Sequence, residues 1–392
     1  MPDPAAVGQH LHEVAAALVR RGHRVDVICS CRGYDDPDRI YPARETIDGV
    51  NVRRYPLPFF SKTNMPLRLF GSVWAMAAIF FMALCGGRAD GVIFSTSPPM
   101  VGLLAVLVAS LKRASSIYWA MDLNPDQLVA MGKLTPRSPI YRAIESVNRT
   151  ILSRSRLTVT LDRFMAGRLR SGGRRPHRVL VLPPWAPAPA DRPVPHDENP
   201  FRKRHKLDGM FVVMYSGNHS PANPLDTIIR AAVALKDDGR IRFAFIGGGM
   251  EKKRVQTIVA EHALSNVLDL PYQPMAELPY SLGAADVHVV TLGPAMVGIV
   301  HPCKVYGAMA VGRPILFVGP RPSHVTDILD GCDVGPAVQH GDIDGCVAAI
   351  RSLAALPATE RDAMGRAAAD LVGERFDHDE LVTRFCEAAE RV

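Results

Sequence analysis

The sequence predicts an α/β protein of two doubly wound domains, in each of which helices cover a parallel sheet. Short apolar strands alternate with amphipathic helical segments along the chain, and this alternation is typical of parallel sheets. The 392 residues exceed the length that one compact core usually holds. Residues 183–195 are rich in proline, which favours an extended, semi-rigid connector near the middle of the chain.

We therefore expect a first domain over residues 1–183, a linker over residues 184–200 and a second domain over residues 201–375. A final helix within residues 376–392 lies beyond the second domain, and we expect it to pack back on the first. Two similar halves joined by a short linker suggest a ligand cleft between them.

Composition narrows the classes of partner. A net charge of +7 suits anionic partners such as nucleotide diphosphates or acidic lipid. The chain shows neither zinc-ligand spacing nor an aromatic-studded basic stripe, so we expect no nucleic acid and no metal. Seven cysteines without paired spacing and an N-terminus without an apolar run indicate a reduced, cytoplasmic chain.

The first domain begins with a helix rather than a strand. Apolar residues from Val7 to Leu18 follow helical spacing, and Met1 to Pro4 already form the loop that leads into this helix. A doubly wound domain normally begins with a strand, so we expect either an upstream strand of about five or six residues or a domain that tolerates the gap. Further strands are expected at residues 25–29, 50–52, 92–94 and 116–119.

Residues 69–87 are uncharged and as long as a membrane-spanning helix. Glycine and serine within them, and a strand almost directly afterwards, oppose spanning. Arg68 and Arg88 flank the segment as interfacial anchors do, so a helix on the membrane surface is the favoured interpretation, and a buried helix remains open. The basic tract at residues 163–178 is interpreted as a solvated face, with acidic lipid as the alternative.

Asp122 is the candidate catalytic residue of the first domain. It follows the strand at residues 116–119, and the carboxyl ends of parallel strands are where open α/β sheets bind ligands. Ser95 to Pro99 follow another strand in the same way. The alternative role for Asp122 is a helix or turn cap.

The second domain repeats the pattern. A strand at residues 211–215 ends in Ser216-Gly217-Asn218-His219, and a strand at residues 243–246 ends in Gly247-Gly248-Gly249. The three glycines do not match a dinucleotide fingerprint and are interpreted as a tight turn.

Residues 298–314 are the strongest candidate for a phosphate site. Pro302 is expected to open a helix, with His301 and Lys304 close to its N-terminus, where free N–H groups and the helix dipole attract anions. The alternative is a surface helix with a solvated lysine. Gly312 suits the helix end, before an apolar strand at residues 315–318.

Eight segments together resemble the family 4 glycosyltransferases of the GT-B fold, of the bacterial surface-polysaccharide kind. They cover nearly the whole chain in the family's order: AAVGQHLHEVAAALVRRGHRVDVICS, IDGVNVRRYPLP, VIFSTSPPMVGLLAVLVA, MDLNPDQLVAMG, FVVMYSGNHSPANPLDTII, FAFIGGGMEKKRVQ, LPYQPMAELPYSLGAADVHVV and GIVHPCKVYGAMAVGRPILFVGP.

The resemblance implies that the second domain binds a nucleotide-sugar while the first presents the acceptor. It places Gly8 in an acceptor-side glycine loop and Asp122 in the loop that meets the acceptor. The positions that it assigns to the donor are Ser216, Gly217, Asn218, His219, Tyr272, Gln273, Gly298, His301, Pro302, Cys303 and Lys304. It further implies transfer with retention of configuration and without a bound metal.

Two departures from the family pattern concern the chemistry. The usual pair of glutamates would fall at Ile299 and Gly307, and the basic pair after the Ser216-Gly217 loop is missing. His219 and Lys304, with Arg313 further off, are left to balance a diphosphate. A subgroup with a P-S-K-like motif is the better match, with Cys303 in the serine position.

The favoured function is a glycosyltransferase that moves a sugar from a nucleotide donor to a lipid-linked or glycan acceptor in envelope polysaccharide synthesis. We expect it at the inner face of the cell membrane. The alternative is a degenerate partner that binds a nucleotide-sugar without turnover. A sugar-nucleotide epimerase would need more cleft carboxylates than Asp122 and Asp126.

Overall fold

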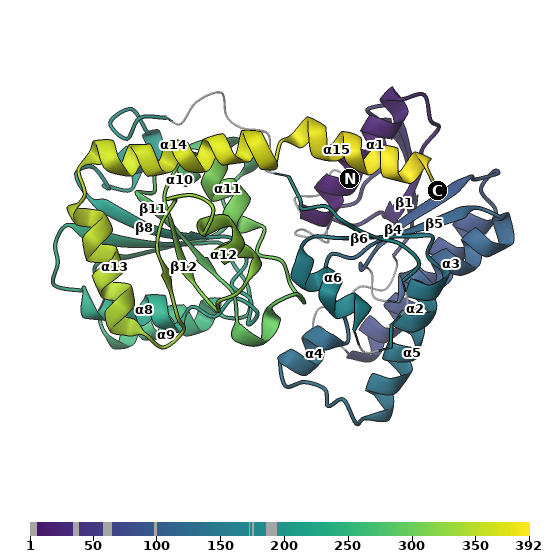
Figure 1. Cartoon of the computed structure of the whole chain (residues 1–392), viewed down its shortest axis with the longest axis horizontal. Coiled ribbons are helices and arrows are strands. Elements are labelled where there is room, and N and C mark those ends of the chain that lie inside the picture. The colour runs from purple at the N-terminus through teal and green to yellow at the C-terminus, as the bar shows by residue number, and fades with distance from the viewer. Residues whose placement is uncertain are drawn as a thin grey trace.

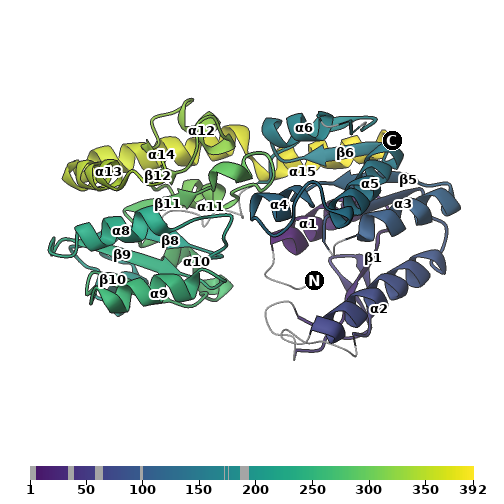
Figure 2. The ribbon, with the colours of Figure 1, turned by 90° about the horizontal axis from the view of Figure 1, so that it is seen from below.

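A computed structural model describes residues 6–33, 39–57, 65–97, 100–171, 173–174, 176–185 and 194–392. Several predictions of the sequence analysis lie outside these residues: the loop at Met1 to Pro4, Pro98 and Pro99, Arg175 and most of the proline-rich linker. The described chain forms two α/β domains that stand side by side, as both views show (Figures 1 and 2).

The first domain holds two separate sheets among its described residues. One has the order β1-β3-β2, with β2 antiparallel, and the other has the parallel order β4-β5-β6-β7. The elements are α1 (Ala6–Arg20), β1 (Asp26–Ser30), β2 (Arg44–Ile47), β3 (Val50–Tyr55), α2 (Met65–Leu84), β4 (Gly91–Ser95), α3 (Val101–Lys112), β5 (Ser115–Trp119), α4 (Asp126–Ala130), α5 (Pro139–Arg154), β6 (Leu157–Thr160), α6 (Arg163–Arg170) and β7 (Val179–Val181).

The strands of the first domain fall into two sheets with no pairing between them among the described residues. β1 pairs only with β3 and β4 only with β5, so both are edge strands among the described residues. No described strand precedes α1. The strands β2, β6, β7, β10 and β13 were not predicted, because each has only two to four residues and gives a weak periodic signal.

The second domain is built on one six-stranded parallel sheet of order β10-β9-β8-β11-β12-β13. Helices cover both faces, with α8 and α9 on one side and α11 and α14 on the other (Figure 1). Its elements are α7 (Pro200–Arg204), β8 (Phe211–Ser216), α8 (Asp226–Ala234), β9 (Ile241–Ile246), α9 (Lys252–Glu261), β10 (Val267–Leu270), η1 (Met275–Glu277), α10 (Leu278–Gly283), β11 (Val287–Thr291), η2 (Pro294–Met296), α11 (Lys304–Ala310), β12 (Ile315–Val318), α12 (His324–Leu329), β13 (Ala337–Val338), α13 (Ile343–Ala355), α14 (Ala358–Arg375) and α15 (His378–Glu390).

The C-terminal helix α15 leaves the second domain and lies against α1 of the first (Figure 1). Arg21 donates two hydrogen bonds of 2.7 Å to the carboxylate of Glu390. The ring of Phe385 lies 4.4 Å from that of Trp119, centroid to centroid, inside a hydrophobic cluster with members from both domains. Burial of large apolar side chains across this boundary stabilises the relative position of the domains.

The segment at residues 69–87 lies largely in the helix α2, and the structure gives no support to the membrane-spanning alternative. None of the described helices combines the length and apolar character needed to cross a bilayer. The buried-helix alternative is also incomplete, because α2 buries Gly71 and Ala75 and exposes large apolar side chains. Those that α2 and the neighbouring α3 expose are Phe70, Val73, Trp74, Phe81, Leu84, Leu107 and Leu111. We call these seven residues the apolar patch.

Candidate active site

The loops that follow β8, β9, β10 and β11 meet at one edge of the second-domain sheet, because the carboxyl ends of parallel strands share an edge. This edge brings together the residues after Ser216, the three glycines from Gly247, Tyr272 and the segment that leads to Lys304. The order of the strands, rather than proximity in sequence, assembles them.

The three glycines do more than form the tight turn expected from the sequence. Gly217, Gly247 and Gly249 all have φ between 126° and 133°, a region that favours glycine. A Cβ on Gly247 would lie 2.1 Å from the carbonyl oxygen of Gly217, and one on Gly249 would lie 2.4 Å from the Asn218 side chain. These glycines therefore let the Gly217-Asn218 loop pack directly on the loop after β9.

Lys304 reaches back across this edge to the Gly217-Asn218 loop. Its ammonium donates to the Asn218 carbonyl oxygen over 3.0 Å and to the Tyr215 hydroxyl, and lies over the Tyr215 ring, 3.8 Å from its centroid. None of the ion pairs found among the described residues includes Lys304. Burial lowers the pKa of this ammonium to about 7, since no carboxylate among the described residues pairs with it to stabilise its charge.

His219 does not serve as a second cation. Its side chain is fully buried, and Nδ1 lies 3.0 Å from the carbonyl oxygen of Gly217. Burial, together with the Lys252 ammonium, lowers the pKa of His219 to about 4. The imidazole is therefore neutral at physiological pH and shapes the loop.

Arg313 is likewise remote from this edge. It precedes β12, at the amino end of the sheet, and donates to the carbonyl oxygen of Gly283 over 3.0 Å. The opposite ends of a parallel strand cannot both face one cleft, so Arg313 cannot balance a diphosphate beside Lys304. Its expected role as a distant cation is wrong.

Tyr272 and Gln273 follow β10 beside the glycine loop. The ring of Tyr272 is half exposed, and its hydroxyl donates to the Gly248 carbonyl oxygen over 3.3 Å. The Gln273 amide donates to the Pro271 carbonyl oxygen. An exposed aromatic ring next to the loop offers a flat surface on which a base can stack.

The segment before Lys304 differs from its expected form. The helix α11 begins at Lys304, so Pro302 lies two residues before it and does not open it. The helix has only seven residues, so the Lys304 side chain, rather than a helix dipole, is what this segment offers to the phosphate expected from the sequence. Cys303 is half-buried, and burial raises the pKa of its thiol to about 12, so it is no nucleophile.

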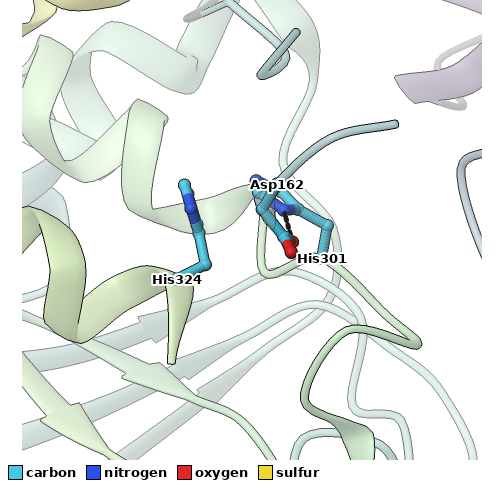
Figure 3. A group of neighbouring side chains, drawn as sticks. All are labelled: Asp162, His301 and His324. Atoms are coloured by element: carbon cyan, nitrogen blue, oxygen red, sulfur yellow. Dashed lines mark hydrogen bonds and ion pairs between the residues drawn. The ribbon is translucent and has the colours of Figure 1, made fainter. Parts of the chain in front are cut away.

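Gly298 and His301 contact the first domain rather than the loops around Lys304. Gly298 has φ of 69°, and a Cβ there would lie 2.7 Å from the backbone of Phe164. The His301 ring is buried, with Nδ1 2.8 Å from the carboxylate of Asp162 (Figure 3). Its Nε2 lies 2.9 Å from the Tyr306 hydroxyl. Both nitrogens already have partners.

Asp122 lies between β5 and α4, close to the segment before Lys304. The neighbouring Leu123 N–H donates to the Ile299 carbonyl oxygen over 3.0 Å, and the charge of Asp122 is near enough to disfavour ionisation of Cys303. Burial raises the pKa of Asp122 to about 6. A carboxyl with a raised pKa in a loop between two domains is typical of a functional residue. No side-chain cap by Asp122 is found for α4.

Gly8 lies within α1, as its third residue, rather than in a loop before it. The apolar face of this helix packs on the core from Val14 onwards, and that burial outweighs the weak helix propensity of one glycine.

The basic tract is also used inside the protein. Arg174 is buried and binds the carboxylates of Asp126 and Glu145 at 2.6 and 2.7 Å, which holds the start of α4 after the Asp122 loop. Arg163 pairs with Asp327 of the second domain. The interpretation of the tract as a solvated face, or as a lipid site, therefore fails for Arg174, whereas Arg163 remains exposed to solvent.

Sequence reasoning missed Asp162, Tyr215 and Arg174. Asp162 follows β6 and caps α6 by accepting from the Met165 N–H over 2.8 Å. The sequence Leu157 to Asp162, an apolar strand with a carboxylate at its end, carried the same signal that singled out Asp122. Nothing in the local sequence distinguishes Arg174 from the other arginines of residues 163–178.

Two doubly wound domains that meet near the carboxyl ends of their strands define the GT-B class of fold. The profile named Glycosyl transferase 4-like domain matches residues 5–185, and that named Glycosyl transferases group 1 matches residues 197–370. The chain belongs to the family 4 glycosyltransferases, and it is a glycosyltransferase.

Similar proteins agree with this assignment. The chain is 28% identical over 335 residues to the probable glycosyltransferase WbjE of Pseudomonas aeruginosa, covering 84% of this chain and 81% of that protein. It is 24% identical over 372 residues to the putative colanic acid biosynthesis glycosyl transferase WcaI of Escherichia coli, covering 91% and 90%.

Solved structures share the fold. A sucrose-phosphate synthase from Thermosynechococcus elongatus has a TM-score of 0.76 at 16% identity, covering 99% of this chain and 93% of that one. Anabaena HepE, solved in complex with UDP and glucose, has a TM-score of 0.72 at 14% identity, covering 100% and 98%.

Proposed function

We propose that the protein transfers a sugar from a nucleotide-sugar, held by the second domain, to a lipid-linked or glycan acceptor presented by the first. The proposed setting is the synthesis of an envelope polysaccharide. The names of the relatives support this setting, since WcaI is named for colanic acid biosynthesis. The fold neighbour HepE has been solved with UDP-glucose, which supports a nucleotide-sugar donor.

The main support for the donor site is the Lys304 ammonium beside the Gly217-Asn218 loop, which has no carboxylate partner among the described residues. Its partners are a carbonyl oxygen and a hydroxyl, both neutral. A half-buried cation without a carboxylate is destabilised until an anion binds, so a diphosphate fits this position. The Lys304 side chain packs closely on Gly217, which has no side chain of its own, so this part of the loop presents backbone groups to a ligand. The exposed Tyr272 ring lies where the base would stack.

The proposed transfer retains the configuration at the anomeric carbon. The bond from this carbon to the diphosphate oxygen breaks, and a bond to the acceptor oxygen forms on the same face. The departing diphosphate oxygen takes the acceptor's proton, so no strong protein base is needed. Lys304 stabilises the negative charge that develops on the diphosphate, and we propose no metal for this role. Asp122 contacts the acceptor hydroxyl as a hydrogen-bond acceptor.

The proposal is tested by incubating the protein with UDP-, GDP- and ADP-sugars, with and without lipid-linked acceptor, and measuring release of nucleoside diphosphate. Release that depends on both donor and acceptor is expected. Binding of a nucleoside diphosphate without any release would instead identify the degenerate partner, which the missing glutamates favour. Absence of binding to every nucleotide would contradict both.

We also propose that the apolar patch docks on an anionic membrane surface, where a lipid-linked acceptor is found. Exposed apolar side chains gathered on two helices that pack together mark interaction sites. Arg113 lies exposed directly after α3 and supplies positive charge, whereas Arg88, exposed in the loop after α2, lies beside Asp90.

A further inference from the structure

The segment that leads to Lys304 is attached to the first domain. Its residues 297–301 belong to the second domain, yet two of its carbonyl oxygens accept hydrogen bonds from the first. The Arg168 side chain donates to Val297 over 2.7 Å, and the Leu123 N–H donates to Ile299 over 3.0 Å. We call residues 297–301 the junction segment.

The third attachment is the buried contact between Asp162 and His301 (Figure 3). One carboxylate oxygen of Asp162 accepts from the N–H of Met165 at the start of α6, and the other lies 2.8 Å from Nδ1 of His301. Although burial raises it, the hydrogen bond from His301 holds the pKa of Asp162 below its ordinary value. A carboxylate only accepts, so the proton lies on Nδ1 of His301.

The contact continues into the second domain. Nε2 of His301 lies 2.9 Å from the Tyr306 hydroxyl, which also lies 2.9 Å from Nε2 of His324. Tyr306 belongs to α11, the helix that begins with Lys304. A carboxylate of the first domain is thus joined through one imidazole to the helix that carries the donor-site lysine.

We propose that Asp162 is a positioning residue for the donor. Through His301 it fixes the junction segment and the Lys304 position, so that the diphosphate is held tightly only while the two domains keep this contact. The inference rests on the proposed function, because it concerns the same donor site. It assigns a donor role to a side chain of the domain that presents the acceptor, which couples the two binding events.

A divalent metal is the competing explanation of this cluster. Asp162, His301 and His324 are ligand-type side chains whose ligand atoms all lie within 4.8 Å of one another. The hydrogen bonds favour the positioning role, because they engage both nitrogens of His301 and one of His324 without a metal.

The test compares Asp162→Asn with Arg163→Ala in binding of UDP, GDP and ADP by calorimetry. Asparagine caps helices as well as aspartate does, but its single oxygen cannot serve both Met165 and His301. We expect the best nucleotide to bind about tenfold more weakly or worse. Arg163→Ala removes the exposed pair with Asp327 across the same boundary, and we expect a change within about twofold.

A second pair of variants keeps the test decisive if Asp162→Asn fails to unfold cooperatively. His301→Asn retains an N–H near the place of Nδ1 but lacks the ring nitrogen that meets Tyr306, so it should lose less nucleotide affinity than His301→Leu. His301→Leu retains none and should lose about as much as Asp162→Asn.

Equal nucleotide affinity in Asp162→Asn and the unchanged protein would overturn the positioning role alone. Failure of the unchanged protein to bind any nucleotide would overturn the proposed function as well. One equivalent of zinc per chain that survives dialysis against a chelator would also overturn the positioning role of Asp162, because Asp162 would then be a metal ligand.

Discussion

The ammonium of Lys304 lies 3.0 Å from the carbonyl oxygen of Asn218, although the two residues are 86 positions apart. This contact joins the loop after β8 to the start of α11. It defines the position at which a donor diphosphate is proposed to bind, and the first two predictions test it.

Lys304→Ala should weaken binding of the nucleoside diphosphate by about 2–3 kcal/mol, because a charge-assisted hydrogen bond is lost. Calorimetry measures the change. Lys253→Ala is the matched control, since Lys253 is an exposed lysine of α9 and should leave affinity unaltered. Unchanged affinity in Lys304→Ala would remove the residue from the site.

Diphosphate binding should take up a proton above pH 7. Burial lowers the pKa of free Lys304 to about 7, and a bound dianion raises it, so the ammonium must be formed on binding at higher pH. Apparent affinity should then fall by up to about tenfold per pH unit above pH 7. Calorimetry at pH 8 in buffers of different ionisation enthalpy counts the protons. A buffer-independent enthalpy would contradict this account.

Asp122→Asn should lower the transfer rate by about 10–100-fold while leaving nucleotide affinity intact, because the acceptor loses a charged hydrogen bond. Burial raises the pKa of Asp122 to about 6, so activity of the unchanged protein should rise with pH through about 6. The variant should lack this step. The exposed Asp90→Asn is the control.

The same substitution should stabilise the fold at neutral pH. With its pKa raised in the folded state, Asp122 binds more protons folded than unfolded between about pH 4 and pH 6. Stability conferred by the protonated carboxyl is therefore lost as pH rises through this range. Asp122→Asn should melt about 2–4 °C higher at pH 7.5 and equally at pH 3.5. Equal melting at both values would show that the carboxylate is well solvated.

Val73→Asp with Phe81→Asp should abolish sedimentation with anionic vesicles, because charge on the apolar patch opposes insertion. The unchanged protein should sediment and be released by high salt. Ile140→Asp alters an equally exposed apolar residue on α5 and serves as the control. No sedimentation of the unchanged protein would eliminate the membrane surface. Resistance to salt and to alkaline extraction would indicate insertion instead.

The sequence alone determined the α/β class, most strands of the second domain and the loops that follow them. Burial on both faces gives central parallel strands such as Phe211–Tyr215 a continuous apolar signal, and the loop after each such strand is easily located. Asp122 was singled out because it follows a strand, and Lys304 because it stands near an expected helix start; the family resemblance then gave both a role.

Tertiary structure decided what each side chain faces. His219 and Lys304 are both basic residues after strands, yet one is buried on its own loop and the other reaches across to Asn218. His301 is turned to Asp162, 139 positions earlier. Such pairings depend on strand order and on how two domains meet. No local pattern records them, because local periodicity reports only whether a residue is buried and not against which partner.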